Sequence, residues 1–188
     1  IMCGRYVIGE KTNSKFPQIN ENNYNVCPGS SVPIIASDEN SIIRKKWSFT
    51  PVWSKKDFNI INCRYETMNE KPSFRKVKRC VFIADGWYEW KKTGTKKTPY
   101  YFCSKNTETM FFAGVYNENG CCIVTKEANN EIKNFHHRQP VILEQKDILD
   151  WIEESYFENK INSLDIYQVS TQVNNPSNNV VENIEKIQ

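Results

Sequence analysis

A cysteine near the start of the chain combines two nucleophiles that can react with an aldehyde. Cys3 follows Met2, and a methionine before a small residue is normally removed, so we expect Cys3 to gain a free α-amine. Such an amine has a pKa of about 7.7–8.0, which leaves a useful fraction neutral and nucleophilic near neutral pH. The thiol can then add to the imine and close a thiazolidine ring. The alternative is a small buried residue at the start of a strand.

A carboxyl group among aromatic residues is a second candidate for chemistry. An apolar run over residues 81–84 leads through a turn to Glu89, which is next to Trp90 and close to Trp87. A carboxylate in such surroundings loses hydration, so its pKa should rise toward the range useful for general acid–base catalysis. The alternative is a glutamate at the rim of a sheet with its head in water.

Residues 61–66 alternate strictly between apolar and polar side chains, which is typical of a strand. Asn62, Arg64 and Glu66 would then share one face. An amide, a guanidinium and a carboxylate on one stripe can orient a substrate, pair with phosphate and move protons. The alternative is a solvated strand face.

Both histidines of the chain lie beside an arginine. His136 can exchange protons near pH 7, and Arg138 can hold a phosphate beside it. Adjacent residues on extended backbone point in opposite directions, so we expect His136, and not His137, to face a site. Two surface histidines before a strand are the alternative.

Aromatic residues make up 13% of the chain, which favours strands or stacking surfaces. Trp53 lies in a turn-like segment and could stack on a base, a contact worth about 1–3 kcal/mol in single-strand binders. The alternative is a tryptophan of the core. The net charge is only +3, so any nucleic-acid surface must be a local patch.

Short β-like runs separated by turns must position these groups, and they predict an α+β domain with a largely antiparallel sheet or barrel. The expected strands cover residues 5–9, 32–36, 41–48, 81–84, 87–91, 100–103, 110–116, 121–125 and 141–143. Apolar residues at helical spacing predict a helix over 144–159, and shorter helices are expected over 65–69 and 130–134. Without a repeat or linker, residues 1–188 are predicted to form a single domain, with an Asn-rich, partly irregular tail from about 173.

The composition also predicts what the protein does not use. Seven cysteines without a C-x-x-C pair argue against a disulfide framework and against zinc, so we expect no metal and no cofactor. No apolar run approaches the roughly 20 residues of a membrane span, and residues 1–20 lack the layout of a signal peptide. We therefore expect an intracellular protein that does not bind membranes. Nothing indicates an assembly surface, so a monomer is expected.

Taken in order, these segments resemble the SRAP (SOS-response-associated peptidase) family over nearly the whole chain. Five motifs in the right order make the resemblance specific, although each alone is weak. The matching stretches are residues 2–6, 24–26, 28–29, 47–53, then Asn62, Arg64, Glu66 and Thr67, then 84–90, 124–125, His136, Arg138, Pro140 and 173–175.

The resemblance implies a compact β domain with a barrel-like core and a channel for single-stranded DNA that contains an abasic site. It implies that Cys3 is linked through a thiazolidine to the opened sugar, that Asn62 orients the sugar, that Glu89 is the acid–base carboxylate and that His136 assists ring opening. The resemblance also assigns DNA contacts to Arg5, Arg64, Arg138, Trp53 and Pro28.

One departure from the family pattern bears on this chemistry, and two other functions remain open. Ile1 precedes Met2, whereas the family pattern begins Met-Cys, and while both remain the Cys3 nitrogen is an amide that cannot form an imine. The first alternative is a thiol peptidase that uses Cys3 with His136, in keeping with the autoprocessing for which the family is labelled. The second is a non-catalytic single-strand binder that uses only Trp53 and the arginines.

Overall fold

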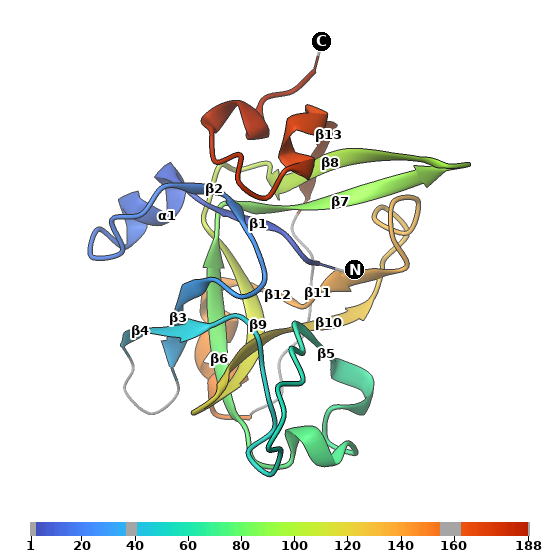
Figure 1. The fold of residues 1–188 in the computed structure, drawn as a ribbon. Coiled ribbons are helices and arrows are strands. Elements are labelled where there is room, and N and C mark those ends of the chain that lie inside the picture. Colours follow the sequence, from blue (N-terminus) through green and yellow to red (C-terminus); the bar gives the residue numbers. More distant parts are fainter. Residues whose placement is uncertain (1–2, 37–40, 155–162, 188) are drawn as a thin grey trace.

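Two mainly antiparallel sheets pack against each other in the computed structural model, which describes residues 3–36, 41–154 and 163–187 (Figure 1). The first sheet has the strand order β13-β8-β7-β1-β2. Its strands are β1 (Tyr6–Ile8), β2 (Asn23–Val26), β7 (Gly86–Thr93), β8 (Lys96–Ser104) and β13 (Leu164–Gln168).

The second sheet has the order β11-β10-β9-β6-β3-β4, with β12 paired to β9 and β5 paired to β10. Its strands are β3 (Ser31–Ala36), β4 (Ile42–Lys46), β5 (Asn62–Arg64), β6 (Lys78–Ala84), β9 (Met110–Asn117), β10 (Gly120–Glu127), β11 (Arg138–Pro140) and β12 (Ile142–Leu143). Among the strand pairs of the described ranges, β5 and β10 run parallel and the others run antiparallel.

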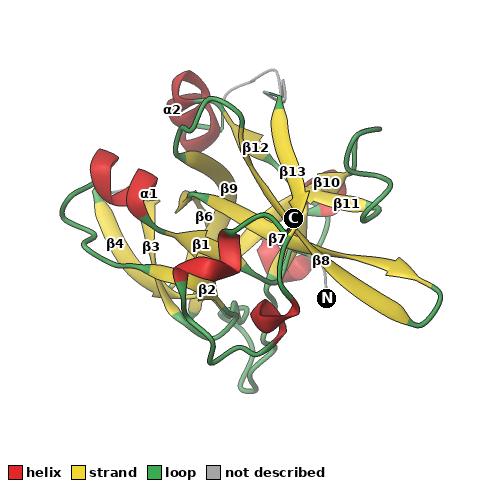
Figure 2. Ribbon diagram, turned by 90° about the horizontal axis from the view of Figure 1, so that it is seen from above, coloured by secondary structure: helices red, strands yellow, loops and turns green. Residues whose placement is uncertain are grey.

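The helices are few and short, and Figure 2 shows α1 and α2 at the edge of the molecule. They are α1 (Glu10–Lys15), α2 (Ile148–Ile152) and the 3-10 turns Tyr65–Thr67, Pro72–Phe74, Gln145–Asp147, Thr171–Asn174 and Val181–Ile184. No helix within the described ranges has the length and apolar character needed to cross a bilayer. The expected α+β class with a mainly antiparallel β core is confirmed, although the sheets form a barrel-like sandwich and not a closed barrel.

A sharp corner moves the chain from the second sheet to the first. β6 ends at Ala84 and β7 begins at Gly86. Between them the buried carboxylate of Asp85 accepts hydrogen bonds from the backbone N–H groups of Lys11 (3.0 Å) and Thr12 (2.8 Å), in the first turn of α1. Gly86 is required here because a Cβ would collide with the backbone of the neighbouring strand β8. The corner sets the register of β7, and therefore the position of Glu89.

A hydrophobic cluster fills the space between the sheets. Its large members are aromatic: the rings of Tyr6 and Trp47 meet edge to face at 5.2 Å, and those of Trp87 and Phe102 stack at 4.8 Å. Cys3 belongs to this central cluster, so the N-terminal segment is anchored in the middle of the molecule.

The nine strands expected from the sequence are all present, but the helices differ from prediction. The range 144–159 forms the 3-10 turn Gln145–Asp147 followed by the single α-turn of α2, and residues 155–159 lie outside the described ranges. Only Tyr65–Thr67 of the range 65–69 forms a 3-10 turn, and the predicted helix over 130–134 is wrong, because these residues form successive turns. The strand alternation over 61–66 ends at Arg64, where the Tyr65 turn begins.

The tail from residue 173 lacks strands within its described part, as expected, but it is firmly packed. Val173 and Asn183 are fully buried. The side-chain amide of Asn25, on β2, donates to the backbone carbonyls of Asn175 (3.0 Å) and Asn178 (2.8 Å). The tail therefore covers the outer face of the first sheet beside β1 and β2.

Candidate active site

Cys3 and Glu89 are brought together by the pairing of β1 with β7. The register places Tyr6 opposite Trp87, and the Tyr88 N–H donates to the Arg5 carbonyl at 3.0 Å. Continuation of this pairing brings the residues before β1 alongside Glu89. The backbone nitrogen of Cys3 donates a hydrogen bond to Oε1 of Glu89 at 3.0 Å. The nitrogen expected to act as nucleophile thus lies in direct contact with the expected acid–base group.

Glu89 lies in a buried environment that favours its neutral form. Its side chain is only 2% exposed. Burial raises its pKa from the ordinary value of 4.5 to about 8, and the hydrogen bond from Cys3 opposes the rise only in part. The predicted burial and raised pKa are confirmed. At neutral pH the group is mainly protonated and can donate a proton.

The thiol of Cys3 is buried as well. Burial, and next the adjacent Glu89, raise its pKa well above the ordinary value, so the sulfur remains a neutral thiol at neutral pH. The backbone of Cys3 has φ = 43°, in the left-handed region that residues other than glycine seldom adopt. The residue is therefore held in an unusual conformation at the point where the chemistry is expected.

Asn62 begins β5 and approaches the central cluster from the second sheet. It lies opposite Ile123 of β10, and the carbonyl of the preceding Ile61 accepts a hydrogen bond from the Trp47 indole at 3.0 Å. The side-chain nitrogen Nδ2 of Asn62 is buried and makes no hydrogen bond within the described part of the chain. A buried donor without a partner is costly, which marks Nδ2 as a group able to bind a ligand.

His136 follows a run of turns that joins β10 to β11. Its ring nitrogen Nδ1 lies 3.1 Å from the backbone nitrogen of Arg138 and 3.3 Å from its carbonyl oxygen. Burial lowers the pKa of His136. The expectation that the two histidines point in opposite directions is wrong, because the segment is not extended there and the rings of His136 and His137 stack at 4.4 Å. His136 is half-buried, whereas His137 is exposed.

Asn62 and His136 reach the central cluster through their neighbours. Ile61, Tyr100 and Phe135 all pack against the cluster that contains Cys3. Tyr100 lies directly opposite Glu89 in the β7–β8 pair, and its ring meets that of Phe135 at 4.8 Å. The structure thus joins Cys3 and Glu89 directly, and brings the segments of Asn62 and His136 to the same cluster.

The three arginines assigned to DNA differ in how much of each guanidinium is available. Arg5 donates from Nη1 to Asn25 Oδ1 (2.6 Å) and to the Val173 carbonyl (2.8 Å), so it binds β2 and the tail. Arg138 is held by Glu66. Arg64 is exposed and makes no side-chain hydrogen bond or ion pair within the described residues. Arg64 is therefore the arginine best placed to meet a phosphate.

Trp53 and Pro28 are both exposed, in two loops. The Trp53 side chain is 58% exposed and meets Phe58 edge to face at 5.5 Å. Beside it, the loop forms a small polar cavity of about 170 Å³ whose lining includes Lys46, Lys55 and Lys56. The exposed aromatic pair thus lies next to a cavity lined by three lysines and one aspartate, Asp57.

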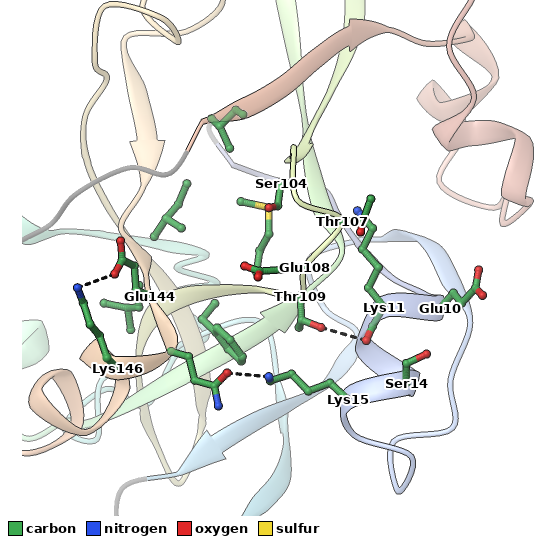
Figure 3. Close-up of a pocket in the computed structure, with 16 residues that line it drawn as sticks. Glu10, Lys11, Ser14, Lys15, Ser104, Thr107, Glu108, Thr109, Glu144 and Lys146 are labelled. Carbon is green, nitrogen blue, oxygen red and sulfur yellow. Dashed lines mark hydrogen bonds and ion pairs between the residues drawn. The ribbon is translucent and has the colours of Figure 1, made fainter.

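A cavity of about 990 Å³ lies elsewhere, between α1, the β8–β9 connection and the segment after β12 (Figure 3). Lys15 Nζ donates to Gln145 Oε1 across it at 2.7 Å, and Lys146 pairs with Glu144 at 2.8 Å. Its lining includes none of the predicted site residues. In the part of the chain that the structure describes, no three His, Cys, Asp or Glu side chains are grouped to hold a metal ion.

Comparison with known proteins decides the family. Residues 2–176 match the family described as SOS response associated peptidase (SRAP). The chain belongs to the SRAP family. It is 32% identical to the abasic site processing protein YoqW of Bacillus subtilis, over 98% of this chain and 99% of the relative. It is 28% identical to the abasic site processing protein YedK of Escherichia coli, over 70% of this chain and 64% of the relative.

Solved structures of other proteins show the same fold. A protein from Bacteroides thetaiotaomicron aligns with a TM-score of 0.83 at 21% identity, over 99% of this chain and 100% of its own. A protein from Bordetella bronchiseptica aligns with a TM-score of 0.72 at 19% identity, over 89% of this chain and 100% of its own. At this identity the likeness establishes the fold alone.

Sequence reasoning missed the groups that support the site. The sequence marks Glu66 as one of three polar residues on a stripe and as part of the SRAP pattern, but it does not predict the ion pair with Arg138. Nor was the packing of Phe135 against Tyr100, which draws the His136 segment to the first sheet. The polar stripe of residues 62–66 was the available signal for Glu66, because a carboxylate next to an amide and an arginine needs a partner.

Proposed function

We propose that this SRAP protein processes abasic sites in single-stranded DNA by forming a covalent link through Cys3. The observation that most supports this proposal is the 3.0 Å hydrogen bond between the Cys3 nitrogen and Glu89, whose buried carboxyl has a pKa of about 8. The proposal requires cleavage of the Met2–Cys3 bond, because only a primary amine condenses with an aldehyde.

The reaction proceeds in three balanced steps. The neutral α-amine of Cys3 adds to the sugar aldehyde and gives a carbinolamine. Protonated Glu89 donates its proton to the leaving hydroxyl and water departs, and the nitrogen then returns its own proton to the Glu89 carboxylate, which leaves the neutral imine. The Cys3 sulfur then adds to the imine carbon while its proton passes to the nitrogen, which closes the thiazolidine. A neutral Glu89 suits the first step, because an ionised carboxylate at this distance would stabilise the unreactive ammonium form.

The remaining site residues have supporting roles in this proposal. Asn62 Nδ2, buried without a partner, donates to a sugar oxygen. His136 uses Nδ1 for Arg138, which leaves Nε2 to assist opening of the sugar ring. Arg5, Arg64 and Arg138 form the basic side of the DNA path, and Trp53 and Pro28 contact bases near the lesion. The peptidase alternative gains no support from the Cys3 thiol, which is neutral and lies beside Glu89.

The proposal is tested by mixing protein that begins at Cys3 with an oligonucleotide containing one abasic site, followed by denaturing electrophoresis and intact-mass analysis. The wild type should give an adduct that resists heat and alkali, with the mass of protein plus DNA minus one water. Cys3→Ala should give none, and Cys3→Ser only an adduct that needs borohydride to survive. Cys27→Ser, which alters a partly accessible thiol away from Glu89, is the matched control and should behave as wild type.

Three outcomes would exclude the proposal. A stable adduct from Cys3→Ser would rule out the thiazolidine. An adduct on chain that retains Ile1 and Met2 would point to another nucleophile, such as a lysine. If Cys3→Ala binds the oligonucleotide normally and wild type forms no adduct, the protein is a non-covalent single-strand binder.

A further inference from the structure

Glu66 and Arg138 form a two-pronged ion pair beside the site. Nη1 of Arg138 donates to Oε1 of Glu66 and Nη2 donates to Oε2, both at 2.7 Å. The pair is further anchored to β10: Arg138 Nη2 donates to the Thr125 carbonyl at 2.7 Å, and the Glu127 N–H donates to Glu66 Oε1 at 3.0 Å. Parallel charge-assisted bonds of this kind fix orientation as well as distance. The Arg138 side chain is only 10% exposed.

The ion pair connects two strands that do not pair with each other. β10 has β5 on one side, where Arg64 lies opposite Thr125, and β11 on the other, where Arg138 lies opposite Glu127. Glu66 follows the end of β5, and Arg138 is the first residue of β11. The ion pair therefore links β5 and β11 across β10.

One candidate catalytic residue lies in or next to each of the linked strands. Asn62 is the first residue of β5, a strand of only three residues, and His136 stands two residues before β11. The link to His136 is direct, because both backbone polar groups of Arg138 contact its Nδ1. A shift of Arg138 would move the His136 ring, and a shift of Glu66 would move the end of β5.

We propose that Glu66 is a positioning residue that holds Arg138 across β10 and thereby fixes Asn62 and His136 relative to each other. The proposal rests on the proposed function for its kinetic readout. A positioning role predicts different effects on DNA affinity and on reaction rate, whereas the loss of a simple DNA contact would lower both. Loss of the Glu66 charge releases the Arg138 guanidinium and removes a negative charge near the DNA path, so DNA affinity should be kept or increased. The reaction should nevertheless slow, because its groups are no longer held in place.

Glu66→Gln tests this split. The rate of adduct formation is measured at saturating abasic oligonucleotide, and Kd is measured for an oligonucleotide of the same length without the lesion. We expect the rate to fall by about 10- to 100-fold, as expected for a displacement of about 1 Å in a catalytic site, and Kd to stay the same or decrease. Glu127→Gln is the matched control, because it removes the same charge from β10 at a side chain that is 78% exposed. This control should react at the wild-type rate.

A second variant and a DNA-free measurement keep the test decisive. Glu66→Asp retains the charge but shortens the side chain, so it should also slow the reaction without changing the salt dependence of binding. In protein without DNA, the ring NMR signals of His136 should move in both Glu66 variants and not in Glu127→Gln. A wild-type rate in both Glu66 variants, a parallel loss of rate and affinity, or unmoved His136 signals would each overturn the proposal. If wild type forms no adduct, the proposed function fails, and the NMR comparison still tests the positioning role.

Discussion

The backbone nitrogen of Cys3 and Oε1 of Glu89 lie 3.0 Å apart, although 86 positions separate the two residues in the sequence. The hydrogen bond joins the residues before β1 to the middle of β7. Because the carboxyl is buried and its pKa is about 8, the nitrogen lies next to an uncharged acid at neutral pH. This one contact has consequences for the rate of reaction and for the stability of the protein.

The rate of adduct formation should depend on pH in a bell-shaped manner. It should rise as the Cys3 amine loses its proton, ordinarily at about 7.7–8.0, and fall as Glu89 ionises, at a pKa that burial raises and a charged α-amine beside it would lower. Glu89→Gln cannot donate that proton, so it should react about 10²- to 10⁴-fold more slowly and lack the alkaline limb. Single-turnover rates over a pH series check this. An unchanged alkaline limb in Glu89→Gln would assign it to another group.

Glu89 should also make the fold less stable as pH rises. Its pKa is about 8 in the folded protein and near 4.5 when unfolded. Between these values the folded state binds the proton and the unfolded state does not. The stabilising contribution of Glu89 is therefore fully present below about pH 4.5 and is lost toward pH 8. The free energy of unfolding should fall by at most about 1.4 kcal/mol per pH unit on this account. The free energies of unfolding of wild type and Glu89→Gln should be compared by urea denaturation across this window. As pH rises, the stability advantage of wild type should shrink, and Glu89→Gln should then become the more stable protein. A constant difference would contradict the raised pKa.

Arg64 should contribute to DNA affinity through phosphate contact alone. Arg64→Gln should weaken binding of single-stranded DNA and reduce the slope of log affinity against log salt by about 0.7, the value for one phosphate contact. The matched control is Arg44→Gln, which removes the same charge at an exposed arginine paired with Glu21. Equal slopes for wild type and Arg64→Gln, measured by fluorescence anisotropy, would exclude this contact.

Asn25 should be important for stability, because its amide joins β2 to the tail. The side chain is 3% exposed, donates to backbone carbonyls of the tail and accepts from Arg5 at 2.6 Å. Asn25→Ala leaves these groups without a partner, at about 1–3 kcal/mol for each one that water cannot reach. Urea denaturation should show this loss, whereas Asn106→Ala, in an exposed turn, should match wild type. A wild-type midpoint for Asn25→Ala would mean that the tail does not support the fold.

The strands were predictable because alternation and β-branched or aromatic content are local properties. The helix over 144–159 was overestimated, since its apolar spacing also suits the 3-10 turn and the single α-turn that form there. β2, β11 and β13 were missed, because Asn23–Val26 is short and runs into the Pro28-Gly29 turn, and because Arg138–Pro140 and Leu164–Gln168 lack a clear apolar alternation. The burial of Glu89 followed from its aromatic neighbours. Its contact with Cys3 is a long-range pairing, which no local pattern encodes.

The long-range contacts of β1 also bear on the order of events during synthesis. A chain leaves the ribosome N-terminus first, so β1 is made well before β7 and longest before the tail. Arg5 donates to the carbonyl of Val173, 168 positions later. Until those residues emerge, the segment around Cys3 lacks the partners that cover it in the folded protein. The burial of Cys3 beside Glu89 therefore cannot be completed until β7 has been synthesised.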